Sequence, residues 1–202
     1  MARGMFIVVS APSGTGKSTI CQRLLEACPE LRFSVSYTSR PARPNEIDGK
    51  DYHFISRREF QSRIDNGEFV EWVENYGNFY GSSQKTMESF LHNGQDLLLD
   101  IEPRGAKNIK RKFRGGVYIF ILPPSRDELL KRLEGRGCET DKVIQDRFEQ
   151  AESEIKEIPL YDYVIINKNL ETAVDQLISI YKAEKCRRIR LRSEIKKFIR
   201  NK

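Results

Sequence analysis

The sequence predicts an α/β protein in which helices flank a parallel sheet. Short apolar runs such as MFIVVS, DLLLDI, GVYIFIL and YVII alternate along the chain with longer amphipathic segments. This alternation is typical of a parallel sheet wrapped by helices, and unbroken hydrophobicity within a run indicates a strand buried on both faces. With 202 residues, 39% of them hydrophobic, the chain suits one folded unit with a sizeable core.

The elements of this core follow one another in a regular order. A strand at 5–10 leads into a helix that ends at Cys28, and a strand at 96–101 precedes a basic helix. A strand at 116–122 precedes a helix from Ser125, and a strand at 163–166 precedes a long C-terminal helix. We expect residues 1–32, 83–125 and 158–202 to form the core.

Two regions interrupt this order. Residues 33–82 contain the segments FSVSY, DYHFI, FVEWVE and NFYGS with turn signals at DGK and YGN, which predicts an insert of small antiparallel strands. Within it, Ser56 and Glu59 form a capping box for a short helix that ends at Gly67. Residues 126–157 are mostly polar and rich in arginine, so we expect a mobile helical lid.

Composition limits the location and the metal chemistry of the protein. No apolar stretch approaches the roughly 20 residues that span a bilayer, and MFIVV is too short for a signal peptide, so we expect a cytoplasmic protein without a membrane partner. Four cysteines include no C-x-x-C pair and lie apart from both histidines. We therefore expect reduced thiols and no zinc site.

The positive charge of the chain is concentrated in a tail. Residues 182–202 hold ten Lys and Arg against two Glu, whereas the whole chain has a net charge of only +6. The spacing of the apolar residues predicts a solvated amphipathic helix, and no interleaved aromatics favour nucleic acid. A contact in a homo-oligomer stays open as an alternative. The apolar residues of the tail are Ile189, Leu191, Ile195, Phe198 and Ile199.

The stretch SAPSGTGKST, residues 10–19, lies between the first strand and the first helix. Its two glycines let the backbone N–H groups curl inward, and the helix adds its positive N-terminal end, which together make a nest for phosphate oxygens. The lysine brings a charge to the β- and γ-phosphates, and the next hydroxyl suits Mg²⁺. The pattern of a P-loop is complete apart from Ala11, which replaces its first glycine. The predicted ATP-binding residues are Ser13, Gly14, Thr15, Gly16, Lys17, Ser18 and Thr19.

Further polar residues suit a metal and a second phosphate. The strand LLLDIE ends in Asp100, which we expect next to the phosphates, with Mg²⁺ held through water. In the insert, Arg40 and Arg43 lie in a proline-stiffened loop that suits clasping a phosphate, and Tyr52 and Tyr80 offer hydroxyl donors. Surface arginines and packed tyrosines are the structural alternative.

In combination, these motifs resemble the guanylate kinase family. The chain carries A-P-S-G-T-G-K-S-T, S-x-T-S-R-x-x-R-x-x-E-x-x-G-x-D-Y-x-F, F-V-E-W, N-F-Y-G-S, L-D-I-E and R-L-x-x-R-G in that order. The resemblance covers nearly the whole chain. It implies a P-loop core, a GMP-binding insert at 33–82, a lid at 126–157, and Mg²⁺-dependent transfer of phosphate from ATP to GMP or dGMP.

The resemblance also implies roles for single residues. Lys17, Arg40, Arg132, Arg136 and Arg147 are implied as catalytic residues, and Asn167 is placed near the adenine of ATP. The implied GMP-binding residues are Ser36, Arg40, Arg43, Glu46, Tyr52, Glu71, Tyr80, Ser82, Asp100 and Glu102, and the implied metal residues are Ser18 and Asp100. Glu102 departs from the aspartate that many members carry.

Two physical arguments support these roles independently. Guanine presents N1–H and N2–H₂ side by side, so the single carboxylate of Glu71 can accept both, whereas the N1 acceptor of adenine would leave that carboxylate unsatisfied. Arg132 and Arg136 lie four apart on one helix, where like charges repel by roughly 0.2–0.5 kcal/mol unless an anion such as a triphosphate lies between them. Arg147, on the next helix, is a third cation for that anion.

Three other functions are alternatives to guanylate kinase activity. Other nucleoside monophosphate kinases usually have helical acceptor inserts, whereas the insert here is predicted to be β-rich. Non-catalytic guanylate-kinase-like modules that bind proteins generally lose the P-loop lysine, which this chain keeps as Lys17. A nucleic-acid binder would rely on the basic tail alone.

Overall fold

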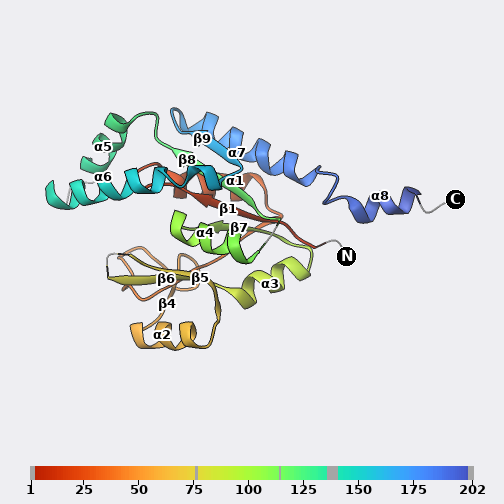
Figure 1. Cartoon of the computed structure of the whole chain (residues 1–202), viewed down its shortest axis with the longest axis horizontal. Coiled ribbons are helices and arrows are strands. Elements are labelled where there is room, and N and C mark those ends of the chain that lie inside the picture. Colours follow the sequence, from red (N-terminus) through yellow and green to blue (C-terminus); the bar gives the residue numbers. More distant parts are fainter. Residues whose placement is uncertain (1–2, 76, 114, 136–140, 200–202) are drawn as a thin grey trace.

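A five-stranded parallel sheet forms the centre of the protein in the computed structural model, which describes residues 3–75, 77–113, 115–135 and 141–199 (Figure 1). Its strands lie in the order β2-β7-β1-β8-β9, and every neighbouring pair is parallel. The predicted α/β class is confirmed. The strands are β1 (Phe6–Ser10), β2 (Leu31–Phe33), β7 (Asp96–Asp100), β8 (Val117–Leu122) and β9 (Tyr163–Ile166).

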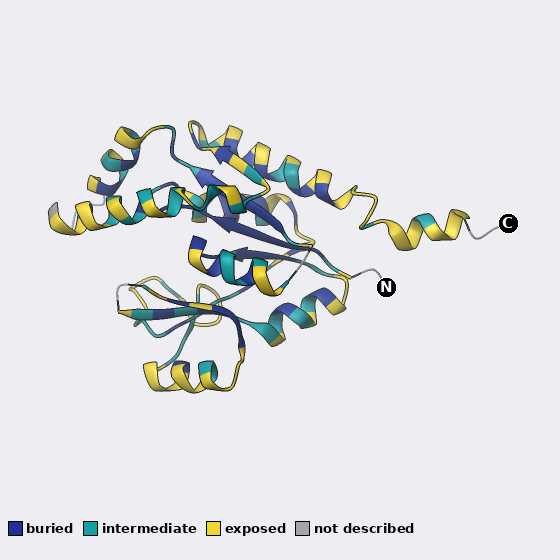
Figure 2. Cartoon of the chain, in the orientation of Figure 1, coloured by how far each residue is buried: buried dark blue, intermediate teal, exposed yellow. Residues whose placement is uncertain are grey.

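The two faces of this sheet are covered by different helices. Residues of β1 alternate between the faces, because successive side chains of a strand point in opposite directions. Ile7 and Val9 pack with α1 (Lys17–Ala27) and α7 (Leu170–Lys185) in one apolar cluster. Phe6 and Val8 pack with α3 (Gln84–His92) and α4 (Pro103–Lys112) in the other. Figure 2 shows that the buried residues concentrate along this sheet and its helices.

The insert forms a second sheet beside the first. It holds β3 (Tyr37–Thr38), β4 (His53–Phe54), β5 (Phe69–Asn75) and β6 (Asn78–Ser83) in the order β4-β3-β6-β5, with α2 (Arg57–Asp65) packed against it through Phe60. The Ser56 cap is confirmed, since its Oγ accepts from the backbone N–H of Glu59 at 3.1 Å. The following helix α2 ends one residue before Asn66, close to the predicted Gly67.

Two details of the predicted insert are wrong. The expected strand at 33–37 is split, because Phe33 ends β2 opposite Leu98 in the core sheet and Tyr37 begins β3. Strands β3 and β4 are parallel rather than antiparallel. The connection between Thr38 and His53 explains this, since parallel neighbours need a crossover of about a dozen residues or more.

Helices α5 (Arg126–Glu134) and α6 (Asp141–Ile155) make up the predicted lid, followed by the short helix η1 (Ile158–Leu160). Ser125 caps α5 by accepting from the backbone N–H of Glu128 at 3.1 Å. Leu129, Leu133 and Ala151 bury one another between the two helices. The lid therefore has a small apolar core of its own.

The tail is not one continuous helix. α7 ends at Lys185, and after a turn α8 (Arg192–Ile199) extends away from the body (Figure 1). At the break, Arg187 and Arg190 each form an ion pair with the buried carboxylate of Glu184 at 3.3 Å. The predicted solvated helix of the tail is confirmed for Arg192–Ile199, since α8 contains no buried residue, but it does not extend over the whole of 182–202. None of the helices in the described ranges is long and apolar enough to cross a bilayer.

Candidate nucleotide-binding site

The loop between β1 and α1 presents its backbone to a cavity. Gly14 and Gly16 adopt φ values of 88° and 84°, a left-handed conformation that only glycine takes without strain. Gly16 is also the N-cap of α1 and provides no side-chain cap, so the first N–H groups of this helix stay available to an anion. Thr15 braces the loop twice: its hydroxyl donates to the carbonyl of Pro12 at 2.9 Å, and its carbonyl accepts from Nδ2 of Asn167 at 2.8 Å.

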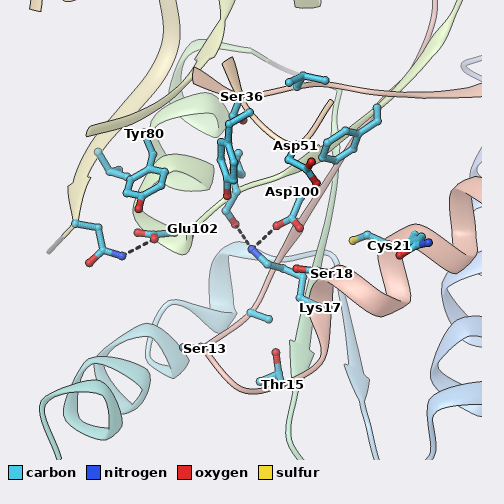
Figure 3. Close-up of a pocket in the computed structure, with 18 of the residues that line it drawn as sticks. Ser13, Thr15, Lys17, Ser18, Cys21, Ser36, Asp51, Tyr80, Asp100 and Glu102 are labelled. Atoms are coloured by element: carbon cyan, nitrogen blue, oxygen red, sulfur yellow. Dashed lines mark hydrogen bonds and ion pairs between the residues drawn. The ribbon is translucent and has the colours of Figure 1, made fainter. Parts of the chain in front are cut away.

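Lys17 lies at the start of α1 and forms an ion pair with Asp100, the last residue of β7 (Figure 3). Its Nζ also donates to the carbonyl of Ile101 at 3.4 Å. Burial lowers the pKa of Lys17, but the charge and hydrogen bond of Asp100 outweigh this and raise it above the usual range. Lys17 therefore stays protonated at the mouth of the P-loop.

A second cationic group lies in the loop between β3 and β4. Arg40 donates from Nη1 and Nη2 to the two carboxylate oxygens of Glu46, each at 2.8 Å. The same carboxylate accepts from the backbone N–H of Arg43 at 2.8 Å. The Arg40 guanidinium also lies 5.5 Å from the ring of Tyr52, whose ring centroid is 6.0 Å from that of Tyr80. The predicted phosphate ligands of the insert thus come together, with Glu46 holding the guanidinium in place.

Glu71 lies in the middle of β5 and is only 4% exposed. Its Oε1 accepts from the hydroxyl of Ser82 at 2.8 Å, and the Ser82 hydroxyl lies 3.4 Å from that of Ser36. Burial raises the pKa of Glu71 to about 7, because its bond from Ser82 compensates only part of the lost hydration. The alternative of an exposed strand carboxylate is wrong, since the neighbouring Trp72 is the exposed residue.

One cavity of about 1060 Å³ connects the P-loop, the second cationic group and Glu71. Asp100 and Glu102 also line this cavity (Figure 3). Asn75 also lines the cavity and donates from Nδ2 to Oε1 of Glu102 at 2.5 Å. Sequence reasoning missed Asn75, although the period of two along β5 signals it, because residues 71, 73 and 75 share one face of the strand.

Helix α6 contributes a wall of this cavity. Arg147, Gln150 and Glu154 line it, and burial raises the pKa of Glu154 to about 7. Gln150 and Glu154 are two further residues that sequence reasoning missed. Arg147 is thus brought to the cavity as predicted.

Three described residues that the sequence predicts for the site, Ser82, Arg132 and Asn167, do not line the cavity. Ser82 is fully buried and donates to Glu71. Arg132 donates to Oε1 of Glu128 at 2.8 Å and to the carbonyl of Asn167 at 3.5 Å. The side chain of Asn167 is buried, and its Nδ2 donates to the carbonyl of Thr15 in the P-loop. Arg136 lies outside the described residues.

Comparison with known proteins identifies the family. A family model described as guanylate kinase matches residues 3–184. The chain belongs to the guanylate kinase family. A guanylate kinase of Syntrophus aciditrophicus is 54% identical over 194 residues, covering 96% of this chain and 93% of the relative. A guanylate kinase of Geobacter metallireducens is 50% identical and covers 93% of each chain. The crystal structure of guanylate kinase from Anaplasma phagocytophilum is 36% identical, with a TM-score of 0.79, and covers 94% of this chain and 90% of that one.

A guanylate kinase needs oxygen ligands for Mg²⁺, and the chain offers them. The hydroxyl of Ser18 is exposed on the first turn of α1, and the carboxylates of Asp100 and Glu102 line the same cavity. Hard oxygen donors of this kind suit Mg²⁺, which is usually held by one or two carboxylates together with substrate phosphates. In the described residues, no group of three or more His, Cys, Asp or Glu side chains is arranged to hold a metal ion by itself.

Proposed function

We propose that the protein transfers the γ-phosphate of ATP to GMP, giving ADP and GDP, and to dGMP, giving ADP and dGDP. The observation that carries this proposal is the buried carboxylate of Glu71 in the same cavity as a P-loop lysine. A P-loop accounts for the donor nucleotide, and a buried carboxylate accounts for an acceptor base that offers two adjacent N–H donors. The family membership of the chain supports the same reaction.

The donor site is proposed to consist of the loop at 13–19. Its backbone N–H groups and the positive end of α1 bind phosphate oxygens, and Lys17 adds a full charge. Lys17 is paired with Asp100. When ATP binds, its phosphates would replace Asp100 as the anionic partner of this lysine. Ser18 and Asp100 would hold Mg²⁺, the latter through water, and the ion when bound neutralises charge on the phosphates.

The acceptor site is proposed to be aligned before GMP binds. Glu46 holds the Arg40 guanidinium by two parallel bonds, which reduces the rotamer entropy lost when the guanidinium binds the GMP phosphate. Arg43, Tyr52 and Tyr80 complete the phosphate cradle. Glu71 accepts from N1–H and N2–H₂ of the base, with Ser36 and Ser82 beside it.

The three parts of the molecule are proposed to act together in closure. We assign the core to 1–32, 83–125 and 158–202, the acceptor insert to 33–82 and the lid to 126–157. Phosphoryl transfer requires alignment, charge compensation and the exclusion of water rather than a protein nucleophile. Closure of the lid would bring Arg132, Arg136 and Arg147 around the phosphates.

A spectrophotometric phosphoryl-transfer assay with ATP tests this proposal by comparing GMP, dGMP, AMP, UMP and dTMP as acceptors. We expect turnover with GMP and dGMP and at least a hundredfold preference over AMP, because the wrong base leaves the buried carboxylate unpaired. Preference for another acceptor would contradict the assignment of Glu71. The Lys17→Ala variant should lose roughly 10²–10³-fold in kcat while still binding GMP. Retained turnover in this variant would reject the role of Lys17.

Location and partners follow from the same reaction. The use of ATP, together with the unpaired thiols of Cys21, Cys28 and Cys186, supports a cytoplasmic enzyme whose partners are its nucleotide substrates. The exposed apolar side chains of α8, among them Phe198 and Ile199, keep a contact between subunits open. The alternative of a non-catalytic module is not favoured, because the P-loop lysine is present.

A further inference from the structure

Gly105 occupies an unexpected position for a glycine. It is the third residue of α4, inside a helix, where glycine is roughly 1 kcal/mol less favourable than alanine. Its φ is not in the left-handed region, so backbone conformation does not require glycine there. A different constraint must therefore explain its lack of a side chain.

The side chain of Glu71 supplies that constraint. A Cβ added at Gly105 would lie 2.3 Å from Oε2 of Glu71 and 3.0 Å from its Cδ. Non-bonded carbon and oxygen atoms do not approach this closely, so an alanine at 105 and the present position of the carboxylate exclude one another. The carboxylate occupies the space that a methyl group would need.

The surrounding packing prevents the two elements from simply moving apart. Val70, next to Glu71 on β5, is buried in the same apolar cluster as Ala106 and Ile109 of α4. The Nζ of Lys112, at the end of α4, donates to the carbonyl of Val70 at 3.0 Å. Because backbone and core are fixed on both sides, an added methyl would displace the carboxylate end of Glu71 rather than the helix.

Among the described glycines, Gly4 and Gly116 are the two others at which an added Cβ would have a neighbour closer than 3.0 Å, and their contacts differ in kind. A Cβ at Gly4 would meet the backbone of Gln95, and one at Gly116 would meet the ring of Phe6. Those contacts concern packing at the other end of the sheet. Gly105 is the described glycine whose closest neighbour is a carboxylate of the proposed site.

We propose that Gly105 is a positioning residue that sets the specificity for the acceptor base, by leaving room for the Glu71 carboxylate against the first turn of α4. The first turn is the positive end of α4, which offsets part of the cost of burying a carboxylate there. With Oε1 bound by Ser82 and Oε2 seated on Gly105, both oxygens have fixed positions. A carboxylate fixed in this way can accept two parallel N–H bonds from one base edge. This inference rests on the proposed role of Glu71 in GMP recognition.

A methyl group at position 105 should displace the carboxylate of Glu71. Restoring an ordinary contact requires the carboxylate to shift by about 1 Å, and misplacements of this size cost up to about 10²-fold in enzyme sites. We expect Gly105→Ala to raise KM for GMP by roughly ten- to a hundredfold and to leave KM for ATP within about twofold. Inosine monophosphate keeps N1–H but lacks the N2 amine, so the preference for GMP over it should fall roughly tenfold.

The test is a set of four enzymes: the natural protein, Gly105→Ala, Glu71→Ala and the double variant, each assayed with GMP, inosine monophosphate and ATP. We expect the methyl group to change the GMP parameters only when Glu71 is present, because the two residues act through one contact. If Gly105→Ala leaves the GMP preference unchanged, or weakens GMP equally in the Glu71→Ala background, the inference is overturned. If Glu71→Ala itself leaves the GMP preference intact, the proposed function of Glu71 fails instead.

A second pair of variants keeps the inference testable if Gly105→Ala folds poorly. Glu71→Asp shortens the side chain and withdraws the carboxylate from the added methyl group. We therefore expect Gly105→Ala to change KM for GMP by less than about threefold in the Glu71→Asp background. A full ten- to hundredfold loss there would show that the methyl group acts through the fold, and the inference would be wrong.

Discussion

Replacement of Glu71 by glutamine should stabilise the protein at neutral and alkaline pH while weakening GMP binding. Glutamine keeps the shape of glutamate, and its carbonyl can accept the bond from Ser82 that Oε1 accepts at 2.8 Å. It removes a charge that the buried site disfavours. If Glu71 recognises the base as proposed, this role lowers the stability of the fold.

The size of this effect follows from proton linkage. Burial raises the pKa of Glu71 from 4.5 to about 7 in the folded protein. Between these values the unfolded chain has lost its proton and the folded protein keeps it, so the free energy of unfolding falls as pH rises. The loss is complete above about pH 7 and amounts to about 3 kcal/mol, since one pKa unit corresponds to about 1.4 kcal/mol.

Urea unfolding of both proteins between pH 5 and pH 8, without nucleotide, measures this difference. We expect the glutamine variant to gain about 2–3 kcal/mol relative to the natural protein over that range. KM of the natural enzyme for GMP should rise below pH 7, where Glu71 becomes protonated, and this pH dependence should be missing in the variant. A stability difference that does not change with pH would refute the argument, since it would mean that Glu71 is not held in a disfavoured charged form.

Two further predictions concern groups that hold others in place. Glu46→Gln should raise KM for GMP roughly tenfold with little change in KM for ATP, because the Arg40 guanidinium loses its charged partner. An unchanged KM for GMP in steady-state assays would contradict this prediction. Truncation after Leu191 should leave thermal stability unchanged, whereas truncation after Lys185 should cost roughly 1–3 kcal/mol, because the buried Glu184 loses both of its arginine partners. Equal melting temperatures for the two truncations would contradict this prediction, and both should retain phosphorylation of GMP.

The sequence predicts the fold and the P-loop well because both depend on local information. Unbroken apolar runs identify the strands of the parallel sheet, and the spacing of Gly14, Gly16 and Lys17 is a complete local motif. The capping serines at 56 and 125 are equally local. Each of these signals can be recognised without knowing which segments meet in space.

The features that the sequence did not reveal depend on contacts between distant segments. Nothing near Asn75 indicates that Glu102 will lie beside it, and the parallel pairing of β3 and β4 depends on the path of a long loop. The sequence predicts that Arg132 pairs with a phosphate anion, whereas in the structure it pairs with Glu128 of the same helix. Such partners are selected by tertiary packing, which propensity and spacing do not encode.

The proposed donor and acceptor sites each contain a cation that is paired with a carboxylate, whereas the carboxylate of Glu71 is bound by a hydroxyl group. Lys17 and Arg40 are each held by a carboxylate, which keeps the cation charged and oriented toward the cavity. A phosphate can replace or join that carboxylate at small electrostatic cost, because one anionic partner substitutes for another. Among the described residues, Glu71 accepts no hydrogen bond from a cation, and burial raises its pKa, so a neutral N–H edge would suit it better than a phosphate. In the proposed function, the two cations held by carboxylates would bind the anionic ends of two nucleotides, while the carboxylate of Glu71, which is not paired with a cation, would select the base of one.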